Sequence, residues 1–340
     1  MSFAKFLIVF NKGLFILCPF VIVVMTLLQI KQQDSNWFSL RKDPLNLTAS
    51  VALMNCGGIH SVKCNDPLVK VSLYGSSYRD YFKKLLGVIE TDYYGDEIMF
   101  FNFDRGLKLE KYILDMLEKI QGIAIKRELF YQHKIYQNFY ASPDGESELT
   151  PEVLRKIYGI TSARSWKVGY EVKAPYHIVA DKMSLEYLMQ TLWQSYVCGY
   201  DAVVFASYNF KCDSMRAFLI VSNQEVNDFL FQKVAIHLGG LKRALEQKEK
   251  FLRLNPQGDL RNMAINYPLF TPTPLPWFQL RQIEELSGEM WSEKKNFQTL
   301  RQDMERLYKD IERIHRKRKE YTHDHTEEFS LVNETKKSVK

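Results

Sequence analysis

An uncharged, apolar run lies near the start of the chain. Residues 13–30 read GLFILCPFVIVVMTLLQI, 18 residues without a charge, and Lys5 and Lys12 precede them. A run of this length is typical of a membrane-spanning helix. A cleaved signal peptide is the alternative, but the KQQDSNW that follows contains no small-residue cleavage site. We therefore predict a single-pass membrane protein with a cytoplasmic N-terminus and its bulk in the periplasm or another extracytoplasmic space.

Two segments in the middle of the chain show the same succession of strand, helix and glycine. In the first, the apolar run 97–103 predicts a buried strand, and the helix that follows ends at Gly122. In the second, 176–180 and 203–206 predict strands, with a helix and Gly199 between them. These patterns predict one or two strand–helix–strand units, and whether the two are a true duplication stays open. Both helices place apolar residues at i, i+3, i+4, i+7, i+8 and i+11, on one face: Leu109, Tyr112, Ile113, Met116, Leu117 and Ile120, then Leu185, Leu188, Met189, Leu192, Trp193 and Tyr196.

The C-terminal part of the chain carries a heptad pattern. Six apolar residues alternate spacings of three and four, as the contact positions of a coiled coil do: Phe297, Leu300, Met304, Leu307, Ile311 and Ile314. The alternative is a single amphipathic helix that folds back on the body. The proline-rich PLFTPTPLP, residues 268–276, favours the coiled coil, because it separates the heptads from the body as a semi-rigid spacer. We expect these residues to bind a second copy or a partner helix.

The fold class predicted from these patterns is an α/β or α+β body between an N-terminal transmembrane helix and a C-terminal coiled coil. Residues 138–151, NFYASPDGESELTP, predict a loop between the two units of the body. The predicted organisation is a membrane anchor at 1–30, a tether at 31–67, a first α/β unit at 68–140, a second at 151–258, a proline-rich linker at 259–276, a coiled coil at 277–321 and a disordered tail at 322–340.

Composition and charge narrow the function only slightly. Hydrophobic residues make up 46% and charged residues 25% of the chain, so a folded body is expected. The formal net charge is +6, but the run from Arg313 to Lys319 holds five cations and no acid. Because the excess charge belongs largely to this run, we expect no nucleic-acid partner.

The cysteines allow two states. Cys56, Cys64, Cys198 and Cys212 lie outside the apolar N-terminal run, and an even number permits disulfides in an oxidising compartment. Four buried or unpaired thiols are the alternative. The sequence contains no C-x2-C pair, so it predicts no zinc site, and it predicts no other metal or cofactor.

Catalytic motifs are scarce. The sequence contains no G-x-S-x-G, H-E-x-x-H, P-loop or G-x-G-x-x-G. Asp104 and Asp181 are weak catalytic candidates, because each follows a predicted strand at the end where α/β sites collect. A short acid at the start of a helix is also favourable in itself, and this structural role is the stronger interpretation of both residues.

The segment around Asp181 resembles the periplasmic domain of the ExbD/TolR biopolymer-transport family. The similarity lies in Val179-Ala180-Asp181-Lys182 and Cys198-Gly199-Tyr200, and more loosely around Asp104; Cys18-Pro19-Phe20-Val21 resembles the start of the family's membrane helix. The resemblance implies one membrane helix and a small α/β periplasmic domain. It departs from the family at Ile22, where the family has an aspartate that takes part in proton flow. The segment 13–30 therefore offers no proton route of its own.

Together these features predict a structural subunit of an oligomeric envelope complex for transport or secretion. Its expected partners are the membrane, other membrane-complex subunits, and helices that join its coiled coil. Two alternatives stay open. One is a membrane-anchored hydrolase or transferase that uses Asp104 or Asp181, and the other is an energy-transducing ExbD/TolR-like subunit.

Overall fold

The computed structural model describes most of the chain between residues 26 and 316. The described residues are 26–27, 35–71, 77–89, 97–174, 181–209, 213–289, 298–299, 302–303, 305–307, 309–310, 312–313 and 316.

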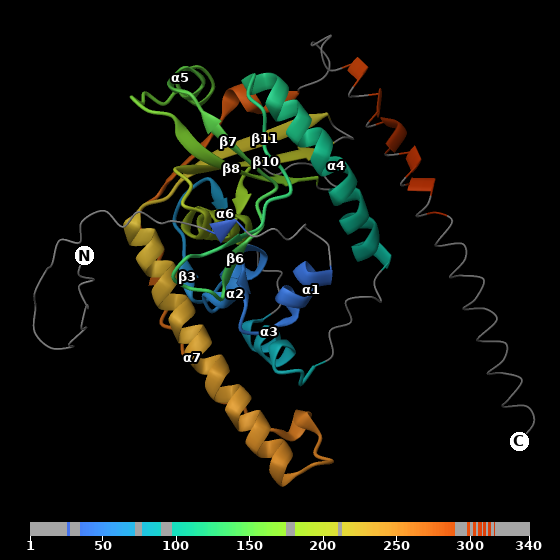
Figure 1. Cartoon of the computed structure of the whole chain (residues 1–340), viewed down its shortest axis with the longest axis vertical. Helices are drawn as coiled ribbons and strands as arrows, with labels where there is room; N and C mark the ends of the chain where they lie inside the picture. Colours follow the sequence, from blue (N-terminus) through green and yellow to red (C-terminus); the bar gives the residue numbers. More distant parts are fainter. Residues whose placement is uncertain are drawn as a thin grey trace, which may run out of the picture.

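A six-stranded sheet forms the centre of the molecule (Figure 1). Its order is β13-β11-β10-β8-β7, with β14 also paired to β11. β8 and β10 are parallel, and the other pairs are antiparallel. The strands are β7 (Gly145–Leu149), β8 (Trp166–Lys173), β10 (Ala202–Asn209), β11 (Ser214–Val221), β13 (Gln279–Gln282) and β14 (Gly288–Glu289).

Helices cover both faces of this sheet, and the alternation of side chains along β10 shows how. Val203 and Phe205 belong to the core under α6 (Leu185–Cys198) and α7 (Gln224–Leu254). Val204 and Ala206 belong to a second core under α4 (Glu97–Gln121) and α5 (Pro151–Tyr158). All eight residues of β10 are buried, as expected of a central strand between two helical layers.

The crossover from β8 to β10 runs through α6, as a parallel pair requires. Ser184 caps the start of α6, where its side chain accepts a hydrogen bond from the backbone of Tyr187. Gly199 ends it in the left-handed conformation, with φ of 58°. The helix predicted after Asp181, its glycine stop and the strand after it are therefore confirmed. The strand predicted over 176–180 lies outside the described residues, and β8 is the parallel partner of β10.

Short strands and helices complete the body. A four-stranded sheet has the order β1-β5-β6-β2, and two further pairs are β12-β3 and β4-β9. These strands are β1 (Thr26–Leu27), β2 (Leu47–Thr48), β3 (Val62–Lys63), β4 (Val69–Lys70), β5 (Tyr131–Gln132), β6 (Phe139–Ala141), β9 (Met183–Ser184) and β12 (Thr273–Pro274). The remaining helices are α1 (Ser35–Lys42), η1 (Ala49–Val51), α2 (Ala52–Asn55), α3 (Tyr78–Leu85), η2 (Leu260–Asn262) and η3 (Glu284–Leu286).

The predicted membrane anchor is wrong. Thr26–Leu27, inside the apolar run 13–30, is strand β1 and pairs with Tyr131–Gln132 of β5. In the part of the chain that the structure describes, no helix has the length and hydropathy needed to cross a bilayer. The rest of the run, 13–25 and 28–30, lies outside the described residues. The predicted single-pass placement, with the bulk in an extracytoplasmic space, is corrected with it.

The strand predicted over 97–103 is also wrong, because these residues form the first turns of α4. A seven-residue apolar run fits a buried helix as well as a buried strand, since periodicity alone does not separate the two. Asp104 therefore lies within a helix instead of at the end of a strand. The first predicted strand–helix–strand unit therefore lacks its first strand. The two units no longer share the same succession of elements.

The predicted coiled coil is corrected by the one heptad residue that the structure describes. Leu307 packs against the core under α4 and α5, so its segment folds back on the body. Phe297, Leu300, Met304, Ile311 and Ile314 lie outside the described residues. The segment predicted as coiled coil, 277–321, also supplies β13 and β14 to the central sheet.

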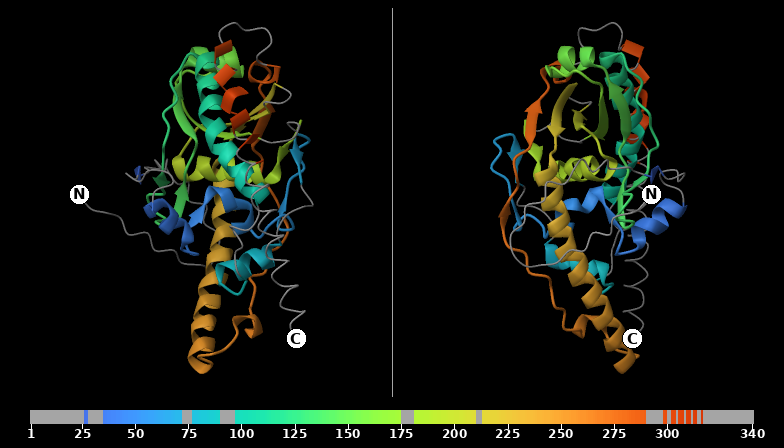
Figure 2. Two further views of the ribbon diagram at one scale, coloured as in Figure 1. Left: turned by 90° about the vertical axis from the view of Figure 1, so that its right-hand side faces the viewer. Right: turned by 60° about the vertical axis from the view of Figure 1, so that its left-hand side comes forward.

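Two segments predicted as connections contribute to the body as well. The loop 138–151 contains β6 and β7, and the proline-rich linker contains β12, which pairs with β3. Lys233 of α7 fastens this linker: its ammonium donates to Ser61 O at 3.1 Å, Ser61 Oγ at 3.0 Å, Thr271 O at 2.7 Å and Thr273 Oγ1 at 3.1 Å. α7 then continues past the sheet (Figure 2).

Replacing Lys233 with methionine should lower the free energy of unfolding by about 1–3 kcal/mol, because the buried Ser61 Oγ would lose this donor and α7 would lose its hydrogen bonds to the linker. Denaturant unfolding followed by circular dichroism measures the change. Lys242→Met, at an exposed position of the same helix, is the matched control and should change stability by less than about 0.5 kcal/mol. Equal effects of the two substitutions would show that the Lys233 hydrogen bonds do not stabilise the fold.

Candidate active site

β8 places charged side chains on a buried face of the sheet. Its residues Val168, Tyr170 and Val172 point into the core under α4 and α5. The alternate residues Glu171 and Lys173 therefore point to the opposite face, toward α6. Glu171 is only 1% exposed, and a buried carboxylate needs hydrogen-bond donors or an opposite charge.

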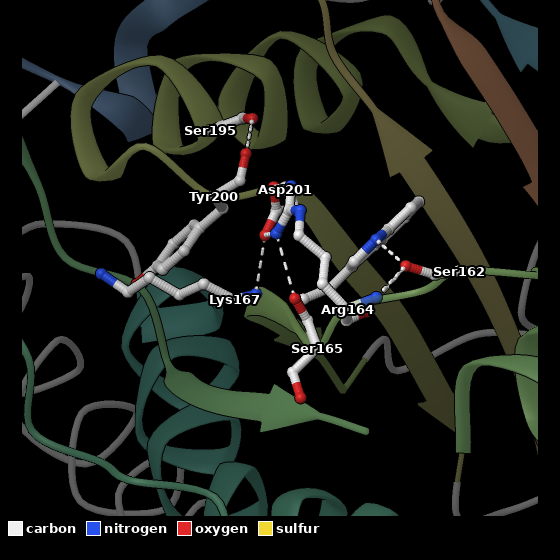
Figure 3. Close-up of polar contacts among 8 residues, drawn as sticks. Ser162, Arg164, Ser165, Lys167, Ser195, Tyr200 and Asp201 are labelled. Carbon is white, nitrogen blue, oxygen red and sulfur yellow. Dashed lines mark hydrogen bonds and ion pairs between the residues drawn. The ribbon is translucent and has the colours of Figure 1, made fainter. Parts of the chain in front are cut away.

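Hydrogen bonds between Asp201 and Lys167, which we call the clasp, hold the start of β8 (Figure 3). Asp201, at the entry to β10, accepts a hydrogen bond from the backbone of Lys167 at 2.9 Å and donates its own backbone N–H to the Lys167 carbonyl at 2.9 Å. Arg164 adds an ion pair to the same carboxylate, at 2.9 Å from Nη1 to Oδ2. Because that ion pair is largely exposed, the backbone hydrogen bonds carry most of the effect. They set the register of β8, four residues before Glu171.

Three donors meet the Glu171 carboxylate. Gln190 Nε2 lies 2.6 Å from Oε1, and Gln194 Nε2 lies 2.6 Å from Oε2. The Lys173 ammonium also contacts Oε1. The two glutamines are four residues apart on α6, so one face of the helix presents both amides to the carboxylate.

Asp144 joins this cluster from the turn before β7. Its Oδ2 accepts a hydrogen bond from the backbone of Val172 at 2.7 Å, and its own N–H donates to Tyr170 O at 3.0 Å. Burial raises the pKa of Asp144 well above its ordinary value, and the charges of Glu171 and Glu110 raise it further, while Lys173 partly offsets them. Asp144 and Glu171 are therefore close enough to repel each other when both are ionised.

Glu110 of α4 is a third carboxylate near the cluster. Burial, and then the charge of Glu171, raise its pKa to about 7, against smaller opposite effects of Lys173 and Arg127. Burial lowers the pKa of Lys173, but Glu171 and Asp144 outweigh it, so the pKa lies above its ordinary value. Lys173 therefore stays a cation at neutral pH and is unsuited to act as a base.

This donor set fits a small, hard divalent cation such as Mg²⁺ or Mn²⁺. Carboxylate oxygens are its preferred ligands, and a cation would relieve the repulsion that raises the pKa values of Asp144 and Glu110. Among the described residues, no group of three or more His, Cys, Asp or Glu side chains is spaced to hold a metal. Mg²⁺ does not require such a cage, since one or two carboxylates with water and substrate phosphates commonly hold it. Asp144 and Glu171 are the residues suited to hold it here.

A small pocket with a cavity volume of about 30 Å³ adjoins the cluster through Gln190. Its polar lining includes Arg41 of α1, Thr48, Ser50 and Ser142, and Arg41 Nη2 donates to Ser50 Oγ at 2.8 Å. Ser142 is two residues before Asp144. The pocket therefore brings a guanidinium and three hydroxyls into one lining with Gln190, which donates to Glu171.

The candidate residues predicted from the sequence lie apart from this cluster or have no catalytic role in it. The Asp181 side chain is 84% exposed and pairs with Arg216 at 3.2 Å. Asp104 lies in α4, six residues before Glu110. Cys56, Cys64 and Cys198 are free thiols, and Cys212 lies outside the described residues. Burial raises the pKa of Cys56 to about 12, so this thiol is unreactive at neutral pH.

Sequence reasoning missed Glu110, Asp144, Glu171, Lys173, Gln190 and Gln194, although part of the signal was present. Glu171 and Lys173 are two residues apart in the otherwise apolar strand around them, so they share a face of β8. Gln190 and Gln194 interrupt the buried stripe of α6. Asp144, in a Pro-Asp-Gly sequence, looks like an ordinary turn residue.

Comparison with known proteins gives limited similarity. No protein-family model matches the chain, and no curated protein matches it significantly. The fold is similar to the crystal structure of an alkaline exonuclease from Laribacter hongkongensis, with 18% identity, a TM-score of 0.45, and coverage of 65% of this chain and 100% of the exonuclease. A structure of that exonuclease in complex with dAMP has 18% identity, a TM-score of 0.43, and coverage of 66% and 99%. Similarity this limited does not transfer a function to this chain.

These findings correct the predicted role. The two solved structures reported above are of an exonuclease and not of an envelope-complex subunit, and no helix among the described residues is long and apolar enough to cross a membrane. The interpretation as a membrane-anchored scaffold is therefore wrong. The expectation of no nucleic-acid partner is not supported by the comparison, because both structures reported above are of an exonuclease. The comparisons do not bear on the resemblance to the ExbD/TolR family.

The raised pKa of Glu110 makes stability depend on pH. Its pKa rises from 4.5 in the unfolded chain to about 7, so protonation stabilises the fold fully below pH 4.5, and this stabilisation is lost as the pH rises through 7. With chelator present, the loss should be on the order of 2 kcal/mol. Mg²⁺ should stabilise the protein more at pH 8 than at pH 5, because it binds the ionised carboxylates.

Thermal unfolding between pH 4.5 and 8, with chelator and with Mg²⁺, measures both effects. Glu110→Gln should flatten the chelator curve across this range, since it removes one titrating group. A pH dependence that is unchanged in Glu110→Gln would contradict the assignment.

Proposed function

We propose that this chain is a metal-dependent hydrolase that cleaves phosphodiester bonds in nucleic acid. The observation that carries the proposal is the cluster of Asp144, Glu171 and Lys173, in which a buried carboxylate, a half-buried carboxylate and a half-buried lysine ammonium interact electrostatically. Such a combination suits phosphoryl chemistry, in which a carboxylate-bound cation and a lysine neutralise the charge of the phosphate.

Each member has a distinct role in this proposal. Asp144 and Glu171 would hold the divalent cation, which supplies Lewis acidity and lowers the pKa of bound water. Lys173, whose raised pKa keeps it protonated, would stabilise the negative charge that develops on the phosphoryl oxygens. Gln190 holds Glu171 in place and borders the neighbouring pocket. Glu110 adds a third negative charge that attracts the cation.

The adjoining pocket supports nucleic acid as the substrate class. Arg41 with the hydroxyls of Thr48, Ser50 and Ser142 suits a phosphate group, because a guanidinium and hydroxyls match its oxygens. A second phosphate beside the bond to be cut is a property of a polynucleotide.

Substitutions in the cluster test the reaction. Asp144→Asn, Glu171→Gln and Lys173→Met should each lower kcat for hydrolysis by about 100-fold or more, because each removes charge from the site of phosphoryl transfer. Linear double-stranded DNA, single-stranded DNA and RNA are incubated with Mg²⁺ or Mn²⁺, and the released nucleotides are quantified. Chelator should abolish the activity of the unaltered protein.

Asp181→Asn is the matched control for these variants, since it removes an exposed aspartate outside the cluster. It should leave the rate within about twofold. Hydrolysis that persists in Glu171→Gln, or that is lost in Asp181→Asn, would contradict the assignment of the site. If only small phosphate esters are cleaved, the hydrolase assignment stands and nucleic acid is wrong.

Replacing Arg41 with methionine tests the pocket. The substitution should raise KM for nucleic acid by about 10-fold or more while kcat changes little, because the guanidinium binds the substrate and does not contact the reacting atoms. Lys42→Met, at an exposed neighbouring position of α1, is the control and should change KM less. If Arg41→Met and Lys42→Met raise KM by the same amount, and by less than tenfold, the pocket does not bind substrate.

A further inference from the structure

The two glutamines of α6 that hold Glu171 differ in what else they contact. Gln190 lines the pocket beside the cluster, so it borders the space proposed for substrate. Gln194 is one helical turn further along and is 0% exposed. Its amide nitrogen lies 2.6 Å from Glu171 Oε2. Among the described residues, Gln194 is therefore the donor to one carboxylate oxygen, while Gln190 and Lys173 serve the other.

The other end of the Gln194 amide is unsatisfied. Its Oε1 is buried and has no hydrogen-bond partner among the described residues. Turning the amide over would place this oxygen against the Glu171 carboxylate, two acceptors facing each other, so the nitrogen must face Glu171. A buried acceptor without a donor destabilises the folded state. Stability alone therefore does not account for a glutamine here, whereas its contact with Glu171 does.

We propose that Gln194 is a positioning residue: it fixes the second oxygen of Glu171, so that this carboxylate keeps one orientation toward the divalent cation. The inference rests on the proposed function, because it assigns Glu171 to cation binding. It assigns different roles to two residues of the same type. Gln190 positions Glu171 and borders the substrate, while Gln194 acts through Glu171 alone.

Two substitutions at position 194 separate positioning from packing. Gln194→Met keeps the length of the side chain but has no donor, and should lower kcat by about 10- to 100-fold with KM within about twofold. Gln194→Glu has the same shape but donates only when its carboxyl is protonated. Its activity relative to the unaltered protein should therefore rise as the pH falls, whereas the ratio for Gln194→Met should not. Gln190→Met is the matched control, and it should raise KM as well as lower kcat.

Kinetics on DNA between pH 5.5 and 9 with Mg²⁺ measure these effects, and thermal unfolding reports on folding. A packing role predicts lower melting temperatures and the same pH profile in both variants, and that result would overturn the proposal. Wild-type kcat in Gln194→Met would also overturn it.

Direct titration with Mn²⁺ keeps this inference separate from the proposed function. If the unaltered protein cleaves no nucleic acid but binds Mn²⁺, Gln194→Met should still weaken binding by about 3- to 10-fold at an unchanged melting temperature. Unchanged Mn²⁺ affinity would overturn the positioning role. If the unaltered protein neither cleaves nucleic acid nor binds Mn²⁺, the proposed function and the positioning role both fall.

Discussion

A carboxylate buried between a sheet and a helix needs hydrogen-bond donors. In this fold, the buried side chain of Glu171 requires donors from the elements packed around it. Glu171 is 1% exposed and is met by two amides of α6 and by the Lys173 ammonium. These contacts require β8 and α6 to lie at a fixed distance and register. The clasp of Asp201 on the backbone of Lys167 provides that register at one end of β8. The two helical layers bury the sheet around Glu171. Its charge therefore lies in surroundings of low dielectric constant, where electrostatic repulsion and attraction are both strong.

The same burial that makes this cluster costly makes it chemically useful. Asp144 and Glu110 have raised pKa values because burial and neighbouring carboxylates disfavour their charged forms. Lys173 has a raised pKa because two carboxylates outweigh its burial. A site that repels its own negative charges is preorganised for a cation, since the folded protein has already met the cost of bringing them together. The unsatisfied oxygen of Gln194 also lowers the stability of the folded state at this site, as the repulsion between the carboxylates does.

The surroundings of the cluster come from distant parts of the chain. Arg41 and Ser50 reach the pocket because β2 pairs with β6, which leads through Ser142 to Asp144. The proline-rich segment, which looks like a spacer in the sequence, is fastened to α7 by Lys233 and continues into β13 of the central sheet. Leu307 extends the contacts of the C-terminal segment to the core under α4 and α5. Segments read as tether, linker and coiled coil thus contribute to one body.

The sequence by itself determined the elements whose signals are local. The stripe of α6, its Ser184 cap, its Gly199 stop and the apolar run of β10 all follow from residues within one segment. It did not determine whether residues 97–103 are strand or helix, because a short apolar run suits both. Only the tertiary structure decided the candidate site. Asp144 looks like a turn residue in the sequence, and only the pairing of β7 with β8 places it against the backbone of Val172. The sequence predicted no role for Glu171 and Lys173, and only the packing of α6 on β8 gives Glu171 its amide donors. Their pKa values depend on burial and on neighbours remote in sequence, and no local pattern specifies either.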